Sequence, residues 1–153
     1  MAERTLIIIK PDAIQRHLGG EIIGRFERKG FKLVAAKFMQ ISEELARKHY
    51  AVHEGKEFFE GAVGFMSSSP SLVMIWEADG VIGMARELLG ATFGPDARAG
   101  TIRGDFGCSK RFNLVHASDS GESAAYEIGL FFGAGEIAEY ELSDAGWLYS
   151  GRD

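Results

Sequence analysis

The stretch Thr5-Leu6-Ile7-Ile8-Ile9, which Lys10-Pro11 follows, is a short and unbroken apolar run near the start of the chain. A run of this length, bounded by a charge and a proline, predicts a buried central strand. Three further strands are expected over residues 31–41, 72–76 and 113–116, of which the first alternates in part and the second is continuously apolar.

The segments between these strands place their apolar residues at helical spacing. Ile22, Ile23 and Phe26 share one face of a helix that we expect to end at Gly30. Ser42 is a suitable N-cap for the next helix. Helices are therefore expected over residues 20–29, 42–50, 59–66 and 82–89, and from a cap at Ser118 or Ser120 to about residue 132.

The order of these elements is strand, helix, strand, then strand, helix, strand, with extra helices inserted. This order is typical of an α+β fold of the ferredoxin-like, split βαβ kind, in which a four-stranded antiparallel sheet carries its helices on one face. Residues 91–112 show no regular pattern. Because so long a loop in a compact domain is usually functional or disordered, we expect a long active-site loop there.

The length of 153 residues and the mass of 16.7 kDa indicate a single domain over residues 1–153. With 46% hydrophobic and 25% charged residues, the composition excludes a disordered or collagen-like chain. No apolar run approaches the roughly 20 residues that span a bilayer, so we expect a cytoplasmic protein with no membrane partner. The single cysteine, Cys108, excludes an intrachain disulfide and a zinc site built from several thiolates.

The net charge is −5, whereas a general nucleic-acid-binding protein is more often basic. The charge is unevenly distributed, because Arg98, Arg103, Lys110 and Arg111 lie close together with only Asp105 among them. A small basic patch on an acidic body indicates a small anionic ligand, and no nucleic acid is required as a partner.

Familiar nucleotide and metal motifs are incomplete in this chain. Residues 19–24 have the glycine spacing of a P-loop, but Arg25-Phe26 follows where a lysine and a hydroxyl residue are needed. The glycine-rich residues 133–138 follow a predicted helix, which favours a turn over a dinucleotide site. His49 and His53 stand one helical turn apart without an accompanying carboxylate, so we favour an exposed surface pair over metal ligands.

His116 stands at the end of a predicted strand and directly before the start of a helix. Such a junction exposes a side chain on a rigid backbone, and the free N–H groups of the helix start favour an anion. A neutral imidazole can attack phosphorus if one ring nitrogen is free and the other is held by an acceptor, for which Glu127 is available. On spacing and charge alone, a structural histidine is the commoner alternative.

Residues 113–120, which read Asn-Leu-Val-His-Ala-Ser-Asp-Ser, resemble the active-site signature of nucleoside diphosphate kinases. The resemblance extends to residues 5–12, 57–59, 86–92, 100–106 and 122–124, and it covers essentially the whole chain in order. This family transfers the terminal phosphate of a nucleoside triphosphate to a nucleoside diphosphate. It does so by a ping-pong mechanism through a phosphohistidine, with broad base specificity, and so maintains the NTP and dNTP pools. The resemblance implies the same reaction here.

The resemblance also implies roles for individual residues. His116 would be the catalytic nucleophile, supported by Tyr50, Glu127 and Ser118. Phe58 would stack on the base, and Mg²⁺ on the phosphates would be the cofactor, contacted by Asp119 through water. The nucleotide-binding residues would be Lys10, Phe58, Arg86, Thr92, Arg103 and Asn113. Without the resemblance, we would interpret Phe58 as a core residue, Arg86 as a surface charge and Thr92 as a turn residue.

Residues 134–153 form a C-terminal extension, in which the apolar side chains of Trp147-Leu148-Tyr149 are expected to pack against another protein surface. In the family a similar tail packs on a neighbouring subunit, so the resemblance implies a homo-oligomer, a hexamer built from dimers in preference to a tetramer. The alternative is a tail that folds back on its own domain. Ala99, where the family commonly has proline, and Phe93-Gly94, where it often has Asn-Pro, bear on loop rigidity and assembly strength rather than on the chemistry.

A binding module without catalysis is the alternative function, because ferredoxin-like sheets also bind RNA or proteins. The chain lacks the Lys/Arg-Gly-Phe/Tyr-rich strand signature of RNA-binding modules, and its net charge is acidic. Both observations favour the kinase over the binding module.

Overall fold

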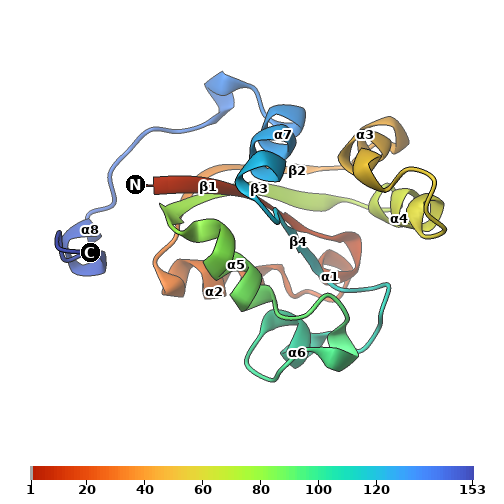
Figure 1. The fold of residues 1–153 in the computed structure, drawn as a ribbon, viewed down its shortest axis with the longest axis horizontal. Coiled ribbons are helices and arrows are strands. Elements are labelled where there is room, and N and C mark those ends of the chain that lie inside the picture. Colours follow the sequence, from red (N-terminus) through yellow and green to blue (C-terminus); the bar gives the residue numbers. More distant parts are fainter. Residues whose placement is uncertain (1) are drawn as a thin grey trace.

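A four-stranded antiparallel sheet organises the computed structural model, which describes residues 2–153 (Figure 1). Its strands are β1 (Ala2–Ile9), β2 (Lys32–Met39), β3 (Ser71–Asp79) and β4 (Val115–Ala117). They lie in the order β2-β3-β1-β4, and every neighbouring pair is antiparallel. The predicted ferredoxin-like order is confirmed, with the apolar run of β1 in the interior of the sheet.

Five of the helices match those expected from apolar spacing: α2 (Gly19–Lys29), α3 (Glu43–His49), α4 (Phe59–Met66), α5 (Val81–Leu89) and α7 (Gly121–Phe131). Three short helices were not predicted, namely α1 (Pro11–Gln15), α6 (Ile102–Phe106) and α8 (Ala145–Leu148). Helices of four or five residues carry too little periodicity to be recognised in a sequence. No helix in the described part of the chain has the length and apolar character needed to cross a membrane.

Helices cover both faces of the sheet, which corrects the expectation of a single covered face (Figure 1). Successive side chains of β1 point to opposite faces of the sheet. Ile7 and Ile9 pack in one core cluster with residues of α2 and α5, whereas Leu6 and Ile8 pack in a second cluster with residues of α3, α4 and α7. The unbroken apolar run of β1 therefore reflects burial on both of its faces.

The predicted helix caps are confirmed in part. Ser42 Oγ accepts a hydrogen bond from the Leu45 amide at the start of α3, as predicted. At the start of α7 the cap is Ser120, whose Oγ accepts from the Ser123 amide. The hydroxyl of the other candidate, Ser118, contacts Glu127 instead, so it belongs to the site described below.

The stretch 91–112 is more regular than its sequence indicates, because it contains α6 and a 3-10 turn at Gly94–Asp96. Thr101 caps α6, since its Oγ1 accepts from the Gly104 amide (3.0 Å). A Cβ atom at Gly94 would lie 2.4 Å from the Gly107 carbonyl oxygen, so only glycine fits this close approach. The stretch is therefore a folded loop held by local caps and backbone packing.

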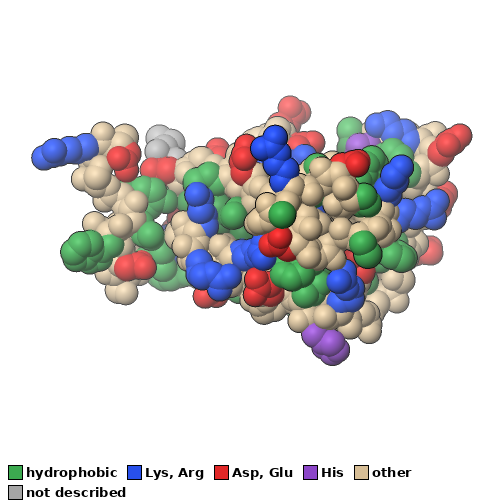
Figure 2. Space-filling model, turned by 90° about the horizontal axis from the view of Figure 1, so that it is seen from below, with side chains coloured by type: hydrophobic (Ala, Val, Ile, Leu, Met, Phe, Trp, Pro, Cys, Tyr) green, Lys and Arg blue, Asp and Glu red, His purple; other side chains and the backbone are tan. Residues whose placement is uncertain are grey.

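The C-terminal segment beyond α7 crosses the edge strand β2 and ends in α8 at one extremity of the molecule (Figure 1). The Ala138 amide donates to the Val34 carbonyl of β2 (2.8 Å), and Leu148 lies against Gly30. These contacts hold the segment on its own domain. Trp147, however, is 94% exposed, and hydrophobic side chains are visible at the protruding left end of Figure 2.

Candidate active site

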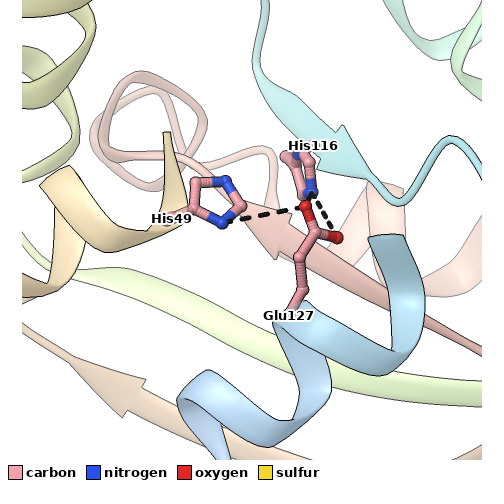
Figure 3. A group of neighbouring side chains, drawn as sticks. All are labelled: His49, His116 and Glu127. Carbon is pink, nitrogen blue, oxygen red and sulfur yellow. Dashed lines mark hydrogen bonds and ion pairs between the residues drawn. The ribbon is translucent and has the colours of Figure 1, made fainter. Parts of the chain in front are cut away.

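His116 lies on β4, the edge strand next to β1. It pairs with Ile8, so its side chain points to the face of the sheet that α3 and α7 cover. The side chain is 20% exposed, and Nε2 lies 3.0 and 3.1 Å from the two carboxylate oxygens of Glu127 on α7 (Figure 3). The fold thus brings the two residues into contact from strand and helix, while part of the imidazole stays accessible to solvent.

The carboxylate of Glu127 determines which nitrogen of His116 carries the proton. A carboxylate only accepts hydrogen bonds, so Nε2 donates and Nδ1 keeps a free lone pair in the neutral ring. Ser118 holds this carboxylate in place, because its Oγ donates to Glu127 Oε1 (2.6 Å) and accepts from the Leu6 amide (3.1 Å). A chain of hydrogen bonds therefore runs from β1 through Ser118 and Glu127 to the imidazole.

His49 at the end of α3 is buried, which corrects the prediction that it lies on the surface. Its ring packs edge-on against His116, with the centroids 4.6 Å apart, and against Tyr50 and Phe131. Burial, and after it the proximity of His116, lowers the pKa of His49 well below its usual value, so the ring is uncharged at neutral pH. The contact of Tyr50 with this cluster runs through His49.

A second group of polar side chains lies where β1 ends and the loop 91–112 returns to the sheet. Lys10 Nζ donates to Asn113 Oδ1 (2.8 Å), and Asn113 Nδ2 donates to the Thr92 carbonyl (3.0 Å). Burial, and after it the charge of Arg103, lowers the pKa of Lys10 to about 8. Because the hydrogen-bond partner of this buried ammonium is a neutral amide, an anionic ligand would stabilise it.

Arg103 on α6 is buried, and its guanidinium is directed at backbone carbonyls. Nε donates to Asn113 O (3.0 Å), Nη1 to Gly90 O (3.3 Å) and Nη2 to Val115 O (2.6 Å). Of the five N–H groups of a guanidinium, two stay available for a ligand. Burial, and after it the charge of Arg86, lowers the pKa of Arg103 to about 10, so the side chain stays charged at neutral pH. Arg103 therefore anchors the loop to β4, a role that sequence reasoning missed.

Leu114 connects the loop to β4 through an unusual backbone conformation, with φ of +73°. This left-handed region is rare for residues other than glycine. The Leu114 amide donates to Asp12 Oδ2 (3.1 Å), and its carbonyl accepts from the Lys10 amide (2.9 Å). The turn lets Asn113 face Lys10 while Val115 enters the strand. Sequence reasoning missed both Asp12 and Leu114 as positioning residues, because no glycine marks the turn.

Phe58 is exposed at the start of α4, whereas the following residue, Phe59, is buried in the core. The alternative interpretation, with Phe58 in the core, is therefore wrong. The Phe58 ring lies beside the His53 ring, with the centroids 5.1 Å apart. An exposed aromatic ring at this position is available to stack on a planar ligand.

Arg86 and Asp119 lie near His116 and interact electrostatically with each other. Arg86 on α5 is exposed and donates from Nη1 to the Ala117 carbonyl (3.2 Å), next to the imidazole in the chain. Asp119 is exposed between β4 and α7, and a hydrogen bond with Ser123 is the main cause that lowers its pKa, so it is ionised at neutral pH. A cationic and an anionic group therefore lie near the residues that directly follow the histidine.

Comparison with known proteins identifies the family to which the chain is similar. The profile of the family described as nucleoside diphosphate kinase matches residues 3–137. The chain is 53% identical to a nucleoside diphosphate kinase of Synechococcus sp. (strain CC9605) over 151 residues, which cover 99% of this chain and 100% of that protein. It is 54% identical to the corresponding protein of Carboxydothermus hydrogenoformans over 147 residues, covering 96% of this chain and 99% of that one.

Two solved structures are similar over nearly the whole chain. A halophilic nucleoside diphosphate kinase from Halobacterium salinarum, solved in complex with CDP, has a TM-score of 0.95 at 45% identity and covers 97% of this chain and 99% of its own. A nucleoside diphosphate kinase family protein from Babesia bovis has a TM-score of 0.93 at 48% identity, with 96% and 99% covered.

Proposed function

The chain belongs to the nucleoside diphosphate kinase family, and we propose that His116 is the residue through which it passes a phosphoryl group from a nucleoside triphosphate to a nucleoside diphosphate. The enzyme class follows from relatives that match over nearly their full length, and the alternative of a binding module without catalysis has no support. The observation that carries the role of His116 is its contact with Glu127, which leaves Nδ1 free to attack.

The reaction at His116 proceeds in two matching halves. Nδ1 forms a bond to the terminal phosphorus, and the bond from that phosphorus to the bridging oxygen breaks, so that its electron pair leaves with the nucleoside diphosphate. The ring then carries a positive charge, which the Glu127 carboxylate stabilises through its contact with Nε2 (3.0 Å). In the second half a different diphosphate attacks the phosphohistidine, and the same steps run in reverse.

The cationic residues near His116 supply what phosphoryl transfer needs most, namely positioning and positive charge. We assign the phosphates to Lys10, Arg86, Arg103 and Thr92, and the ribose hydroxyls to Lys10 and Asn113. The buried ammonium of Lys10 and the two unused N–H groups of Arg103 support this assignment. The Halobacterium relative was solved with CDP, which supports a nucleoside diphosphate as ligand here.

Phe58 contributes affinity by stacking on the base. Its ring is 52% exposed, and it rests on neighbouring side chains rather than in the core. Because every base has a π face, stacking does not discriminate among bases. Broad base specificity is therefore part of this proposal.

Mg²⁺ is the proposed cofactor, carried on the nucleotide phosphates. The residues present fit it, because Asp119 is exposed and ionised beside the histidine. Mg²⁺ typically keeps several waters and binds to one or two carboxylates together with substrate phosphates, so a contact from Asp119 through water suits it. When bound, the ion supplies charge neutralisation on the phosphates.

A homo-oligomer, a hexamer in preference to a tetramer, is the proposed assembly. Phe38 on the edge strand β2 is 62% exposed and Trp147 is 94% exposed, so a single chain leaves apolar side chains uncovered. We propose that the extension 134–153 contributes to a subunit interface through its exposed side chains. Sedimentation equilibrium gives the mass directly, and a monomer at micromolar concentration would contradict the proposal. The cytoplasmic location expected from the sequence belongs to the same proposal.

Labelling of the histidine tests the proposed function. The protein is incubated with ATP labelled in its γ-phosphate and then assayed for label that is labile in acid and stable in base. We expect label on the wild type and none on His116→Ala. The control is His17→Asn, which removes an exposed histidine at a left-handed position that asparagine tolerates. An unlabelled wild type, or a His116→Ala variant labelled like the wild type, would overturn the proposal.

A further inference from the structure

His49 has no part in the reaction proposed above, yet its ring nitrogens are positioned to bind a ligand. Its side chain is 1% exposed, and neither ring nitrogen has a hydrogen-bond partner. Nδ1 points toward the Glu127 carboxylate at 3.8 Å, a distance too long for a hydrogen bond (Figure 3). A buried polar ring without a hydrogen-bond partner costs free energy, and a ligand bound to the ring nitrogens would remove that cost.

We propose that His49, His116 and Glu127 form a binding site for a transition-metal ion of the Zn²⁺ class, and that an ion bound there blocks phosphorylation of His116. The inference rests on the proposed function in one respect, because it takes His116 as the nucleophile. Among residues 2–153, these three side chains are the one group of histidine, cysteine and carboxylate residues compact enough to hold a metal ion.

The positions of the donor atoms fit such an ion. His116 Nε2 is 3.0 Å and His49 Nδ1 is 3.8 Å from Glu127 Oε2, and each residue offers an atom within 4.8 Å of the others. Zinc bonds of about 2.0–2.2 Å at tetrahedral angles place ligand atoms about 3.4 Å apart. Side-chain shifts of roughly 1 Å would therefore complete three bonds. Figure 3 shows the three groups converging on one point from α3, β4 and α7.

The chemistry of the donors selects the class of ion. Two imidazoles and one carboxylate with a fourth position open to water are a typical ligand set for Zn²⁺, whereas Mg²⁺ prefers oxygen ligands. The Ser118 hydroxyl already donates to Glu127 Oε1 (2.6 Å), which fixes the carboxylate in the way that outer ligands of metal sites do. The His116 side chain is 20% exposed, which gives the site a path from solvent.

Metal binding would move the ring proton of His116 and inactivate the nucleophile. In the free enzyme His116 Nε2 donates its proton to Glu127. An ion bound at Nε2 takes the lone pair of that nitrogen, so the proton moves to Nδ1 by exchange with solvent, and the carboxylate changes from acceptor to ligand. Nδ1 then carries the proton and has no free lone pair. Attack by Nδ1 on phosphorus is therefore disfavoured.

Metal binding is measured directly by calorimetric titration of the nucleotide-free protein with Zn²⁺, in two buffers of different ionisation enthalpy. The titrations use a Cys108→Ser background, because the exposed thiol could bind zinc by itself. We expect one strong site per chain and nearly the same heat in both buffers, because each neutral imidazole keeps one ring proton when it binds the ion. His49→Phe keeps the aromatic packing and removes the ligand, and we expect it to weaken this site about 100-fold or more, while His17→Asn should bind like the parent.

The link to phosphorylation is tested by γ-phosphate labelling of each protein with and without one equivalent of Zn²⁺. We expect zinc to lower the labelling rate of the parent at least about tenfold, and to have a much smaller effect on His49→Phe relative to its own zinc-free rate. Zinc binding or inhibition that is equal in the parent and in His49→Phe would overturn the inference. Absence of a strong site in the parent would do the same. Labelling without zinc tests the phosphorylation of His116 by itself, so a failure of the proposed function is distinguishable from a failure of the metal site.

Discussion

The site consists of two groups that are held in different ways. In the nucleophile group, formed by His116, Glu127, Ser118 and His49, side chains from strands and helices contact one another. In the anion group, formed by Lys10, Asn113, Thr92 and Arg103, hydrogen bonds run largely to backbone carbonyls of a loop. A substitution of His116 or Glu127 in the nucleophile group should therefore change the chemistry with the fold intact, whereas one in the anion group should change loop structure and activity together.

Arg103→Ala should produce the largest effect and the clearest coupling of activity to stability. Three backbone carbonyls lose their donor, and a hydrogen bond from a charged donor contributes about 1.5–3 kcal/mol. We expect a loss of about 3 kcal/mol in the free energy of unfolding, measured in urea. Turnover should fall about 10³-fold, because one anchored cation near the reacting phosphate is lost.

Arg86→Ala is the matched control for Arg103→Ala. Arg86 is exposed and makes one long hydrogen bond to Ala117 O (3.2 Å), so its loss should reduce turnover with little change in stability. If Arg103→Ala unfolds at the same urea concentration as the wild type, the loop does not depend on the guanidinium, and the distinction between the two groups fails.

Glu127→Gln tests whether a substitution in the nucleophile group lowers activity without lowering stability. Glutamine keeps the shape of the side chain and an oxygen acceptor, but it cannot stabilise the charge that forms on His116. We expect turnover to fall about 10–100-fold while the free energy of unfolding changes by less than about 1 kcal/mol. A stability loss as large as that of Arg103→Ala would show that Glu127 is mainly a structural residue.

The nucleophile group was only partly predictable from the sequence. The pattern of a strand followed by a helix placed His116 at an exposed junction and made Glu127 available as its acceptor, but the role of His116 as nucleophile came from the resemblance to nucleoside diphosphate kinases. The apolar run of β1 predicted the central strand of the sheet. His49 was misplaced, because the spacing between His49 and His53 says nothing about which face of a short helix is buried. The sequence also did not reveal that both faces of the sheet are covered.

The anion group was harder to predict, because its geometry arises from irregular backbone. Helix α6 has five residues and therefore no readable periodicity. The left-handed turn at Leu114 lacks the glycine that usually marks such a turn, and Asp12 acquires its role only through the amide of that distant residue. The positive charge of Arg103 was visible in the sequence, but its use in anchoring carbonyls depends on long-range packing.

Lys10 should make the anion group sensitive to pH. With a pKa of about 8, the ammonium of the free enzyme loses its charge as pH rises past that value. At pH 9 about one tenth of the free enzyme is protonated, so KM for the diphosphate should rise about tenfold relative to pH 7. Lys10→Met should remove this dependence, and a KM that is constant from pH 7 to 9 in the wild type would contradict the assignment.

Lys10 should also make stability depend on pH, but a rise in pH should increase stability whereas it weakens binding of the diphosphate. Its pKa is lowered in the folded protein from 10.5 to about 8, so between these values the unfolded chain binds more protons than the folded one. The free energy of unfolding should therefore rise with pH across this window, by an amount that Lys10→Met eliminates. Urea unfolding at pH 7.5 and pH 10 measures the difference, and an unchanged stability would show that the folded lysine titrates normally.

A pair of helix-cap variants gives the smallest effect and the most direct comparison of the two groups. Ser42 caps α3, which carries His49, and Thr101 caps α6, which carries Arg103. Replacing either with alanine should cost about 1 kcal/mol, measured in urea. Thr101→Ala should also lower turnover severalfold, because α6 holds the guanidinium over the loop, whereas Ser42→Ala should keep the wild-type rate because α3 packs in the core through its other residues. Equal rates in the two variants would mean that α6 does not need its cap to keep Arg103 in position, and that the anion group is as rigid as the nucleophile group.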